Sequence, residues 1–194
     1  MRVLFGFTIF VCTTALLRAE TSVEIDLQRQ MAYLLDNGRP VLASPISSGR
    51  YGHLTRTGSF KVVEKERSHY SSMYGKIVDA YGNTVVADAD ADMSVPRGGK
   101  FIPAPMHYFM RFDEADGMHA GYLPGYPASH GCVRMPQQLA IAFFNSVSVG
   151  TPVTVFGRTP VNRYSDQSQS GFLRRPRYGP PMGPRFAPPP PWWR

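Results

Sequence analysis

The residues best suited to chemistry lie in one segment, Ser129-His130-Gly131-Cys132-Val133-Arg134, with His119 a short distance upstream. The chain has 2 cysteines, and the other, Cys12, lies in an apolar N-terminal stretch. If that stretch is removed on export, Cys132 has no partner for an internal disulfide. An imidazole can hold a neighbouring thiol as the thiolate near neutral pH. We therefore expect Cys132 to be a nucleophile and His119 its base.

Residues 1–19 have the pattern of a secretory signal peptide. Arg2 supplies the positive charge, Val3 to Leu17 is apolar, and Ala19 offers a small residue for cleavage. The apolar stretch is short for a membrane-spanning helix, which needs about 20 residues. A retained anchor is the alternative. The pattern predicts an exported protein of the periplasm or cell envelope.

The positive charge of the chain belongs to its C-terminal tail. Residues 20–158 contain thirteen Lys and Arg and thirteen Asp and Glu, whereas residues 159–194 contain six Arg and one Asp. A nucleic-acid enzyme normally carries its positive surface on the folded domain, so the charge distribution argues against that class. The tail also holds nine of the 18 prolines and ends in Trp192-Trp193-Arg194. It is expected to be a disordered terminus or a cationic arm that contacts the envelope.

Residues 20–158 are long enough for one domain, and their pattern is mainly β. Short apolar or alternating segments are separated by Gly, Pro, Asn and Asp, which is typical of strands joined by turns. Asp36-Asn37-Gly38-Arg39 has the composition of a hairpin turn. The segments expected to form strands are 23–27, 31–35, 40–44, 59–64, 106–112 and 153–156.

One helix is expected directly after the nucleophile segment. Pro136 suits a first helical turn, and Leu139, Ala142, Phe143 and Ser146 recur at helical spacing. Gly150 and Pro152 then end the pattern. A thiolate near a helix N-terminus is stabilised by the free backbone amides there, although the sequence does not decide whether Cys132 is close enough. A few further short helices are expected.

These residues resemble the L,D-transpeptidase (YkuD) family of bacterial cell-wall enzymes. The family signature is a histidine, a spacer, Ser/Thr-His-Gly-Cys, a variable residue, and Arg or Asn. Here it runs from His119 through the spacer 120–128 to 129–134, and the similarity spans about residues 22–157. Upstream, Ser48-Gly49 and residues 55–60 also match. Three positions depart from the pattern: the spacer is short, Arg56 replaces a common proline, and Ala120 replaces a common Gly or Ser.

The resemblance implies a β-rich catalytic domain that needs no cofactor or metal and acts on peptidoglycan stem peptides. Cys132 would form a thioester with the donor stem after D-alanine leaves, and a second stem would resolve it into a 3–3 cross-link. His119 would move the protons, as general base and then acid. Such an enzyme would serve cell-wall organisation and cell shape.

The remaining signature residues have supporting roles in this hypothesis. Backbone N–H groups at Gly131 and Cys132 are expected to stabilise the oxyanion. Arg134 either contacts a substrate carboxylate or makes a structural ion pair. A backbone carbonyl is expected to set the tautomer of His119, since no acidic partner is visible. His130, Ser129 and Tyr122 are expected to line or orient the site, with packing of a rigid loop as the alternative for Tyr122.

Other interpretations of these residues stay open. Cys132 is an inert buried thiol in one of them, and in another it binds zinc together with His107, His119 and His130. His53 and His69 are expected at the surface, and residues 88–92 in a solvated acidic loop. Alternative functions are an L,D-carboxypeptidase or peptidase that uses the same thioester, and a wall-binding protein without turnover. A sortase-like transpeptidase shares the order His, Cys, Arg, although nothing in the chain resembles the sortase nucleophile strand.

Overall fold

The computed structural model describes residues 20–161, and they form two β-sheets with one helix. The first sheet has five strands in the order β3-β2-β1-β10-β4. Its strands are β1 (Thr21–Asp26), β2 (Met31–Asp36), β3 (Arg39–Pro45), β4 (Gly58–Lys61) and β10 (Pro152–Phe156). The hairpin of β2 and β3 turns at Asn37 and Gly38, both with positive φ, as the turn composition predicts. β1 pairs in parallel with β10, so the two ends of the domain meet in this sheet.

The second sheet carries the signature residues. Its order is β6-β5-β7-β8-β9, with β5 (Glu64–Val78), β6 (Thr84–Asp90), β7 (Lys100–Arg111), β8 (Gly117–Ala120) and β9 (Val133–Met135). The neighbours β8 and β9 are parallel, while β7 is antiparallel to β8. His119 therefore lies in β8, and Cys132 comes directly before β9.

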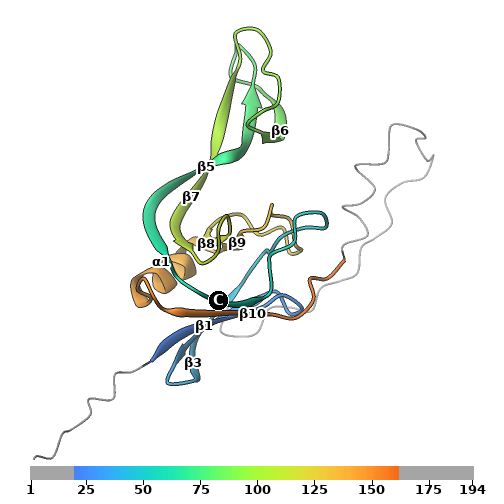
Figure 1. Ribbon diagram of the computed structural model, residues 1–194. Coiled ribbons are helices and arrows are strands. Elements are labelled where there is room, and N and C mark those ends of the chain that lie inside the picture. Colours follow the sequence, from blue (N-terminus) through green and yellow to red (C-terminus); the bar gives the residue numbers. More distant parts are fainter. Residues whose placement is uncertain (1–19, 162–194) are drawn as a thin grey trace, which may run out of the picture. The chain divides into compact units, whose positions relative to one another are not determined.

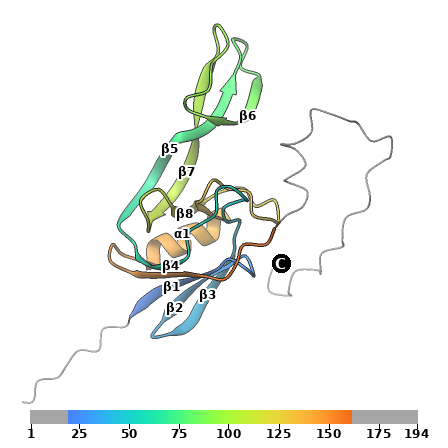
Figure 2. The ribbon, with the colours of Figure 1, turned by 45° about the vertical axis from the view of Figure 1, so that its right-hand side comes forward.

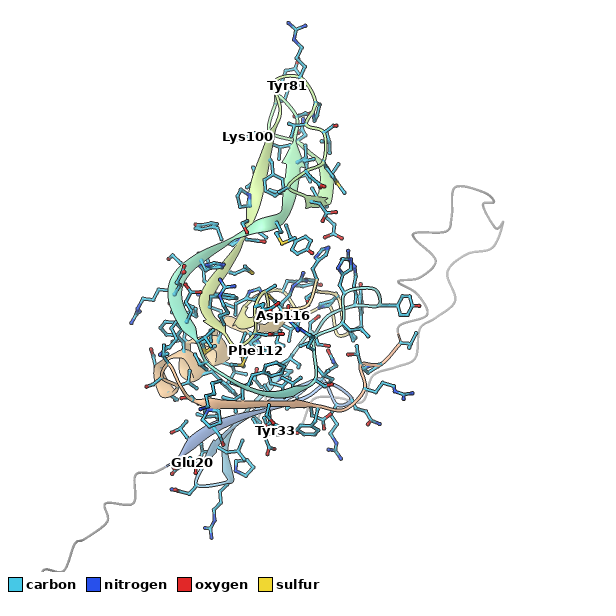
Figure 3. The ribbon with its side chains drawn as sticks, in the orientation of Figure 1. Glu20, Tyr33, Tyr81, Lys100, Phe112 and Asp116 are labelled. Carbon is cyan, nitrogen blue, oxygen red and sulfur yellow. The ribbon has the colours of Figure 1, made fainter. Side chains whose placement is uncertain are left out.

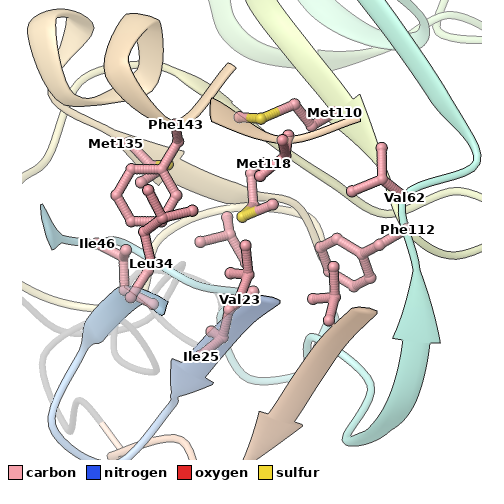
Figure 4. Close-up of a cluster of buried hydrophobic side chains, with 14 of the residues drawn as sticks. Val23, Ile25, Leu34, Ile46, Val62, Met110, Phe112, Met118, Met135 and Phe143 are labelled. Carbon is pink, nitrogen blue, oxygen red and sulfur yellow. The ribbon is translucent and has the colours of Figure 1, made fainter. Parts of the chain in front are cut away.

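The two sheets share a core with the helix α1 (Gln137–Ser146). Figure 4 shows side chains from both sheets meeting the helix residue Phe143. Removing such apolar side chains from water is the main favourable term in folding. The core residues that flank the signature, Met118, Val133 and Met135, are fully buried. The short strands β8 and β9 are thus held in place by their own side chains that pack in the core.

Strands β5, β6 and β7 extend away from the core as an arm (Figures 1 and 2). The pairing of β5 with β7 shifts register between Tyr70 and Gly75, and beyond that shift the two strands continue with β6. The prediction of one strand over 59–64 is wrong, since β4 and β5 divide it at residues 62–63. The prediction of an acidic loop at 88–92 is also wrong, because Asp88 and Asp90 lie in β6.

The mainly β class is confirmed, as is the helix after the signature, with Pro136 as its N-cap residue. Residues 20–161 contain this single helix, so the expectation of further short helices is wrong for that range. No helix in the described range is long and apolar enough to cross a membrane. The expected signal peptide and almost all of the expected tail lie outside the described residues.

Candidate active site

The pairing of β8 with β9 places His119 and Cys132 on adjacent segments of the second sheet. In the parallel register, Met118 lies opposite Val133 and His119 opposite Arg134. Extending it by one residue places Cys132 opposite Gly117. Because side chains alternate along a strand, Gly117, His119 and Cys132 share one face of this ladder. His119 and Cys132 are then diagonal neighbours on adjacent segments.

The imidazole of His119 is buried and fixed by one hydrogen bond. Its Nδ1 lies 2.8 Å from the carbonyl oxygen of Ala120, so Nδ1–H is the donor. That contact confirms the expectation that a backbone carbonyl sets the tautomer. It leaves Nε2 unprotonated and able to accept a proton. Burial lowers the pKa of His119 to about 4, although the hydrogen bond to the Ala120 carbonyl raises it in part.

The thiol of Cys132 is held in its neutral form. Burial raises the pKa of Cys132 to about 11. The backbone N–H of Gly117 lowers this pKa in part, and the charge of Asp116 raises it. The Sγ lies 3.7 Å from the carbonyl oxygen of Ala115, to which the S–H donates. With both pKa values displaced in this way, thiol and imidazole are neutral at pH 7. Burial thus opposes the charged forms of both groups.

Hydrogen bonds close the loop that precedes Cys132. The Ser129 hydroxyl donates to the carbonyl oxygen of Cys132 and accepts from the Gly131 N–H at 3.2 Å. Thr55 donates to the carbonyl oxygen of Gly131 at 2.5 Å and accepts from the Gly49 N–H at 2.9 Å. Ser129 thus supports the loop, as expected, whereas Thr55 was not expected in this role. The Gly131 N–H is occupied by Ser129, so it is a poorer oxyanion donor than expected.

Gly131 is required by its surroundings. Its φ is +125°, and a Cβ at this position would lie 2.2 Å from Oδ1 of Asp116. Only a residue without a side chain fits between the nucleophile loop and that carboxylate. Glycine at position 131 is expected to give the substrate access to the site. The structure adds a second reason for glycine, the close approach of Asp116.

The ring of His130 connects the nucleophile loop to the arm. Tyr74 of β5 stacks on it with a centroid separation of 3.9 Å, and His53 meets it edge-on at 4.8 Å. Its Nε2 lies 2.7 Å from a guanidinium nitrogen of Arg50, which also pairs with Asp88 of β6 at 2.8 Å. Burial lowers the pKa of His130 to about 4, which keeps the ring neutral. His130 thus contacts Tyr74, His53 and Arg50, partners that the sequence did not indicate.

Arg134 lies half-buried beside the nucleophile, with its aliphatic carbons along Gly121. Within residues 20–161 it makes no ion pair, so the structural ion-pair alternative has no support there. Tyr122 is 79% exposed, which contradicts packing of a rigid loop at that residue.

His53 and His69 were both expected at the surface. His69 lies in β5 and stacks on the buried ring of Phe109 at 4.3 Å, so its expected place in a surface loop is wrong. His53 is exposed, as expected, although its ring contacts His130. In residues 20–161, no three His, Cys, Asp or Glu side chains are grouped closely enough to hold a metal ion, which leaves the zinc alternative without a site there.

A comparison with protein families matches residues 20–155 to the L,D-transpeptidase catalytic domain known as YkuD. The chain belongs to the YkuD family. The same residues hold the complete signature, from His119 to Arg134. Curated proteins gave no match to the chain.

Solved structures of L,D-transpeptidases share the fold of this YkuD domain. The Stackebrandtia nassauensis protein has a TM-score of 0.55 at 19% identity, over 77% of this chain and 64% of its own. The Mycobacterium smegmatis protein has a TM-score of 0.56 at 20% identity, over 72% and 59%. The catalytic domain from Enterococcus faecium has a TM-score of 0.51 at 27% identity, over 72% and 99%. The chain thus spans less than two thirds of the first two proteins.

The contact between Gly131 and Asp116 predicts a specific cost of adding a methyl group. We expect Gly131→Ala to lower the free energy of unfolding more than Gly82→Ala, by about 1–3 kcal/mol, which is typical of overpacking. Gly82 is the matched control, because its φ is +86° and a Cβ there would meet nothing within 4 Å. Urea unfolding of both variants measures the difference. Equal losses would contradict the steric role of Asp116.

Proposed function

We propose that the chain is a peptidoglycan L,D-transpeptidase that works through a thioester on Cys132. The observation that carries the proposal is the tautomer of His119, whose Nδ1–H is bound by Ala120 while Nε2 stays free on the face that Cys132 shares. A base with its proton-accepting nitrogen beside a thiol is the arrangement needed for nucleophilic catalysis. Membership of the YkuD family supports peptidoglycan stem peptides as the substrate class.

Acylation begins from the neutral pair. The Cys132 proton moves to Nε2 of His119 as Sγ attacks the carbonyl between the third residue of the stem and the terminal D-alanine. Coupling the two events avoids a separate thiolate, which burial disfavours. The Cys132 N–H, which has no acceptor in residues 20–161, is the better-placed oxyanion donor. D-Alanine then leaves with the proton from His119, and the thioester remains.

Deacylation uses the same groups in reverse order. The amine of a second stem peptide attacks the thioester while its proton passes to Nε2 of His119. The tetrahedral intermediate collapses, the Cys132 sulfur leaves and regains a proton, and a 3–3 cross-link forms. If water takes the place of the amine, the same thioester gives free tripeptide, which is the carboxypeptidase alternative.

Arg134 is proposed to bind a substrate carboxylate. Its guanidinium is half-buried beside the nucleophile and makes no ion pair within the described range. The planar fork of guanidinium N–H donors matches a carboxylate. The donor stem presents one at its terminal D-alanine, close to the bond that Cys132 attacks.

The activity is tested with disaccharide-tetrapeptides and mass spectrometry. Wild type is expected to release D-alanine and to form cross-linked dimers, whereas Cys132→Ala forms none because no thioester can form. His119→Gln is expected to lose about 100-fold or more, a typical contribution of general acid–base catalysis. Free tripeptide without dimer would support the hydrolytic alternative. Equal products from wild type and Cys132→Ala would contradict catalysis by this cysteine.

The low pKa of His119 makes a separate prediction about pH. Because burial lowers that pKa from 6.5 to about 4, the imidazole stays neutral and competent as a base well below pH 6. The acid limb of carbapenem acylation is therefore expected near pH 4. Intact-protein mass as a function of time and pH measures it, a choice of probe supported by a related L,D-transpeptidase whose structure holds imipenem. An acid limb near pH 6.5 would contradict the buried, neutral imidazole.

Export and envelope contact are proposed from the two ends of the sequence. Residues 1–19 have the pattern of a signal peptide, and residues 159–194 combine six arginines with two terminal tryptophans. We expect purified protein to be retained on cell-wall sacculi in a salt-sensitive manner, and truncation after Arg158 to abolish retention. Retention of the truncated protein at the same salt would contradict a role of the tail.

A further inference from the structure

The turn between β7 and β8 covers the nucleophile loop. It is closed by the backbone N–H groups of Phe112 and Asp113, which both donate to the carbonyl oxygen of Asp116 at 3.1 Å. Phe112 and Asp116 bound this turn in Figure 3. Two residues of the turn and the first residue of β8 act on Cys132: Ala115 through its carbonyl, Asp116 through its charge, and Gly117 through its N–H.

The carboxylate of Asp116 lies directly against the residue before the nucleophile. Both of its oxygens fall within 3.2 Å of where a Gly131 Cβ would be. The Asp116 side chain is largely buried, which strengthens its electrostatic effect on neighbours. A negative charge at this position opposes a second negative charge on Sγ.

Arg56 fixes the turn from outside. Its Nε lies 2.6 Å from Oδ2 of Asp113, and its guanidinium reaches Glu114 at 3.3 Å. Arg56 is the residue that departs from the family pattern, where a proline is common. In this chain it joins the segment that holds Thr55 to the turn that holds Asp116.

The charges around Asp116 come from several elements. Burial raises the pKa of Asp116 to about 6, the charge of Asp113 raises it further, and the charge and backbone N–H of Arg56 lower it. Tyr74 of β5 feels the charges of Asp116 and Cys132. Arg111 of β7 and Arg134 of β9 act on the thiol in the opposite direction from Asp116.

We propose that Asp116 is a positioning residue whose negative charge, beside the residue that precedes the nucleophile, adds to burial in disfavouring a charged Cys132 sulfur, so that loss of this charge makes the sulfur more reactive. This inference rests on the proposed role of Cys132 as the nucleophile. The effect runs against the usual one, in which a carboxylate assists catalysis. A neutral thiol also resists oxidation, because susceptibility follows thiolate character.

The effect of Asp116 on the thiol depends on pH, because only the ionised carboxylate carries the charge. Below about pH 6 Asp116 is neutral, so that burial alone disfavours the thiolate, and above that pH the charge of Asp116 disfavours it further. A shift of one unit in the thiol pKa changes the thiolate fraction tenfold. The rate changes by only about threefold, because a thiolate of lower pKa is also a weaker nucleophile.

The test compares alkylation of Cys132 by iodoacetamide in wild type and Asp116→Asn from pH 5 to pH 9. The variant-to-wild-type ratio of rates is expected to be near one at pH 5 and to rise to about threefold above pH 7, with its midpoint near pH 6. Taking a ratio cancels the contribution of His119, which both proteins share. A purely structural role would shift the ratio equally at every pH, and either that result or a slower variant overturns the proposal.

Glu114→Gln is the matched control, because it removes one negative charge from the same turn at a side chain that is 88% exposed. The ratio of its alkylation rate to that of wild type is expected to be one from pH 5 to pH 9. If Asp116→Asn does not fold, 13C NMR of wild type measures the same coupling: the Cβ resonance of Cys132 should shift with the midpoint of the Asp116 carboxyl, and no shared midpoint overturns the proposal. A Cys132 that iodoacetamide never modifies would instead count against the proposed function.

Discussion

The parallel pairing of β8 with β9 is the constraint on which the site depends. It aligns His119 with Arg134 and places Cys132 one step before the ladder, on the same face as the imidazole. A shift of one residue would turn either side chain to the opposite face. The register is secured by burial of Met118 and Val133, which point into the shared core. The core therefore sets the geometry of the chemistry directly.

Burial also sets the charge state of the pair. Removing Cys132 and His119 from water disfavours thiolate and imidazolium alike. For the thiolate, burial outweighs the charges of Arg134 and Arg111, whereas for the imidazolium the charge of Arg134 acts in the same direction as burial. The helix α1 gives little help, because the three residues of β9 separate its N-terminus from Cys132 by about 10 Å, beyond the reach of the helix dipole. In the proposed mechanism the proton therefore moves within the pair as the sulfur attacks, and the tautomer of His119 matters more than a stable ion pair.

The sequence predicted the parts of the fold whose hydrophobic pattern is regular. The β2–β3 hairpin and α1 carry a turn signature and a helical period, and both are confirmed. Of the arm, only part of β7 was predicted, as the strand over 106–112. The rest was missed because β5 contains Ser, His and Gly without apolar alternation, and Asp88 and Asp90 alternate with alanine rather than with large apolar residues. The signature residues were found because they are close in sequence. Thr55, Tyr74 and Asp116 act through contacts between distant segments, which no local pattern encodes.

These distant contacts make the nucleophile loop a junction of three segments. Thr55 holds the carbonyl of Gly131, Asp116 excludes any side chain there, and Tyr74 of the arm stacks on His130. His130 is joined to Cys132 by Gly131, so the ring that stacks on Tyr74 lies two residues from the sulfur. The arm and the candidate nucleophile thus meet in one loop.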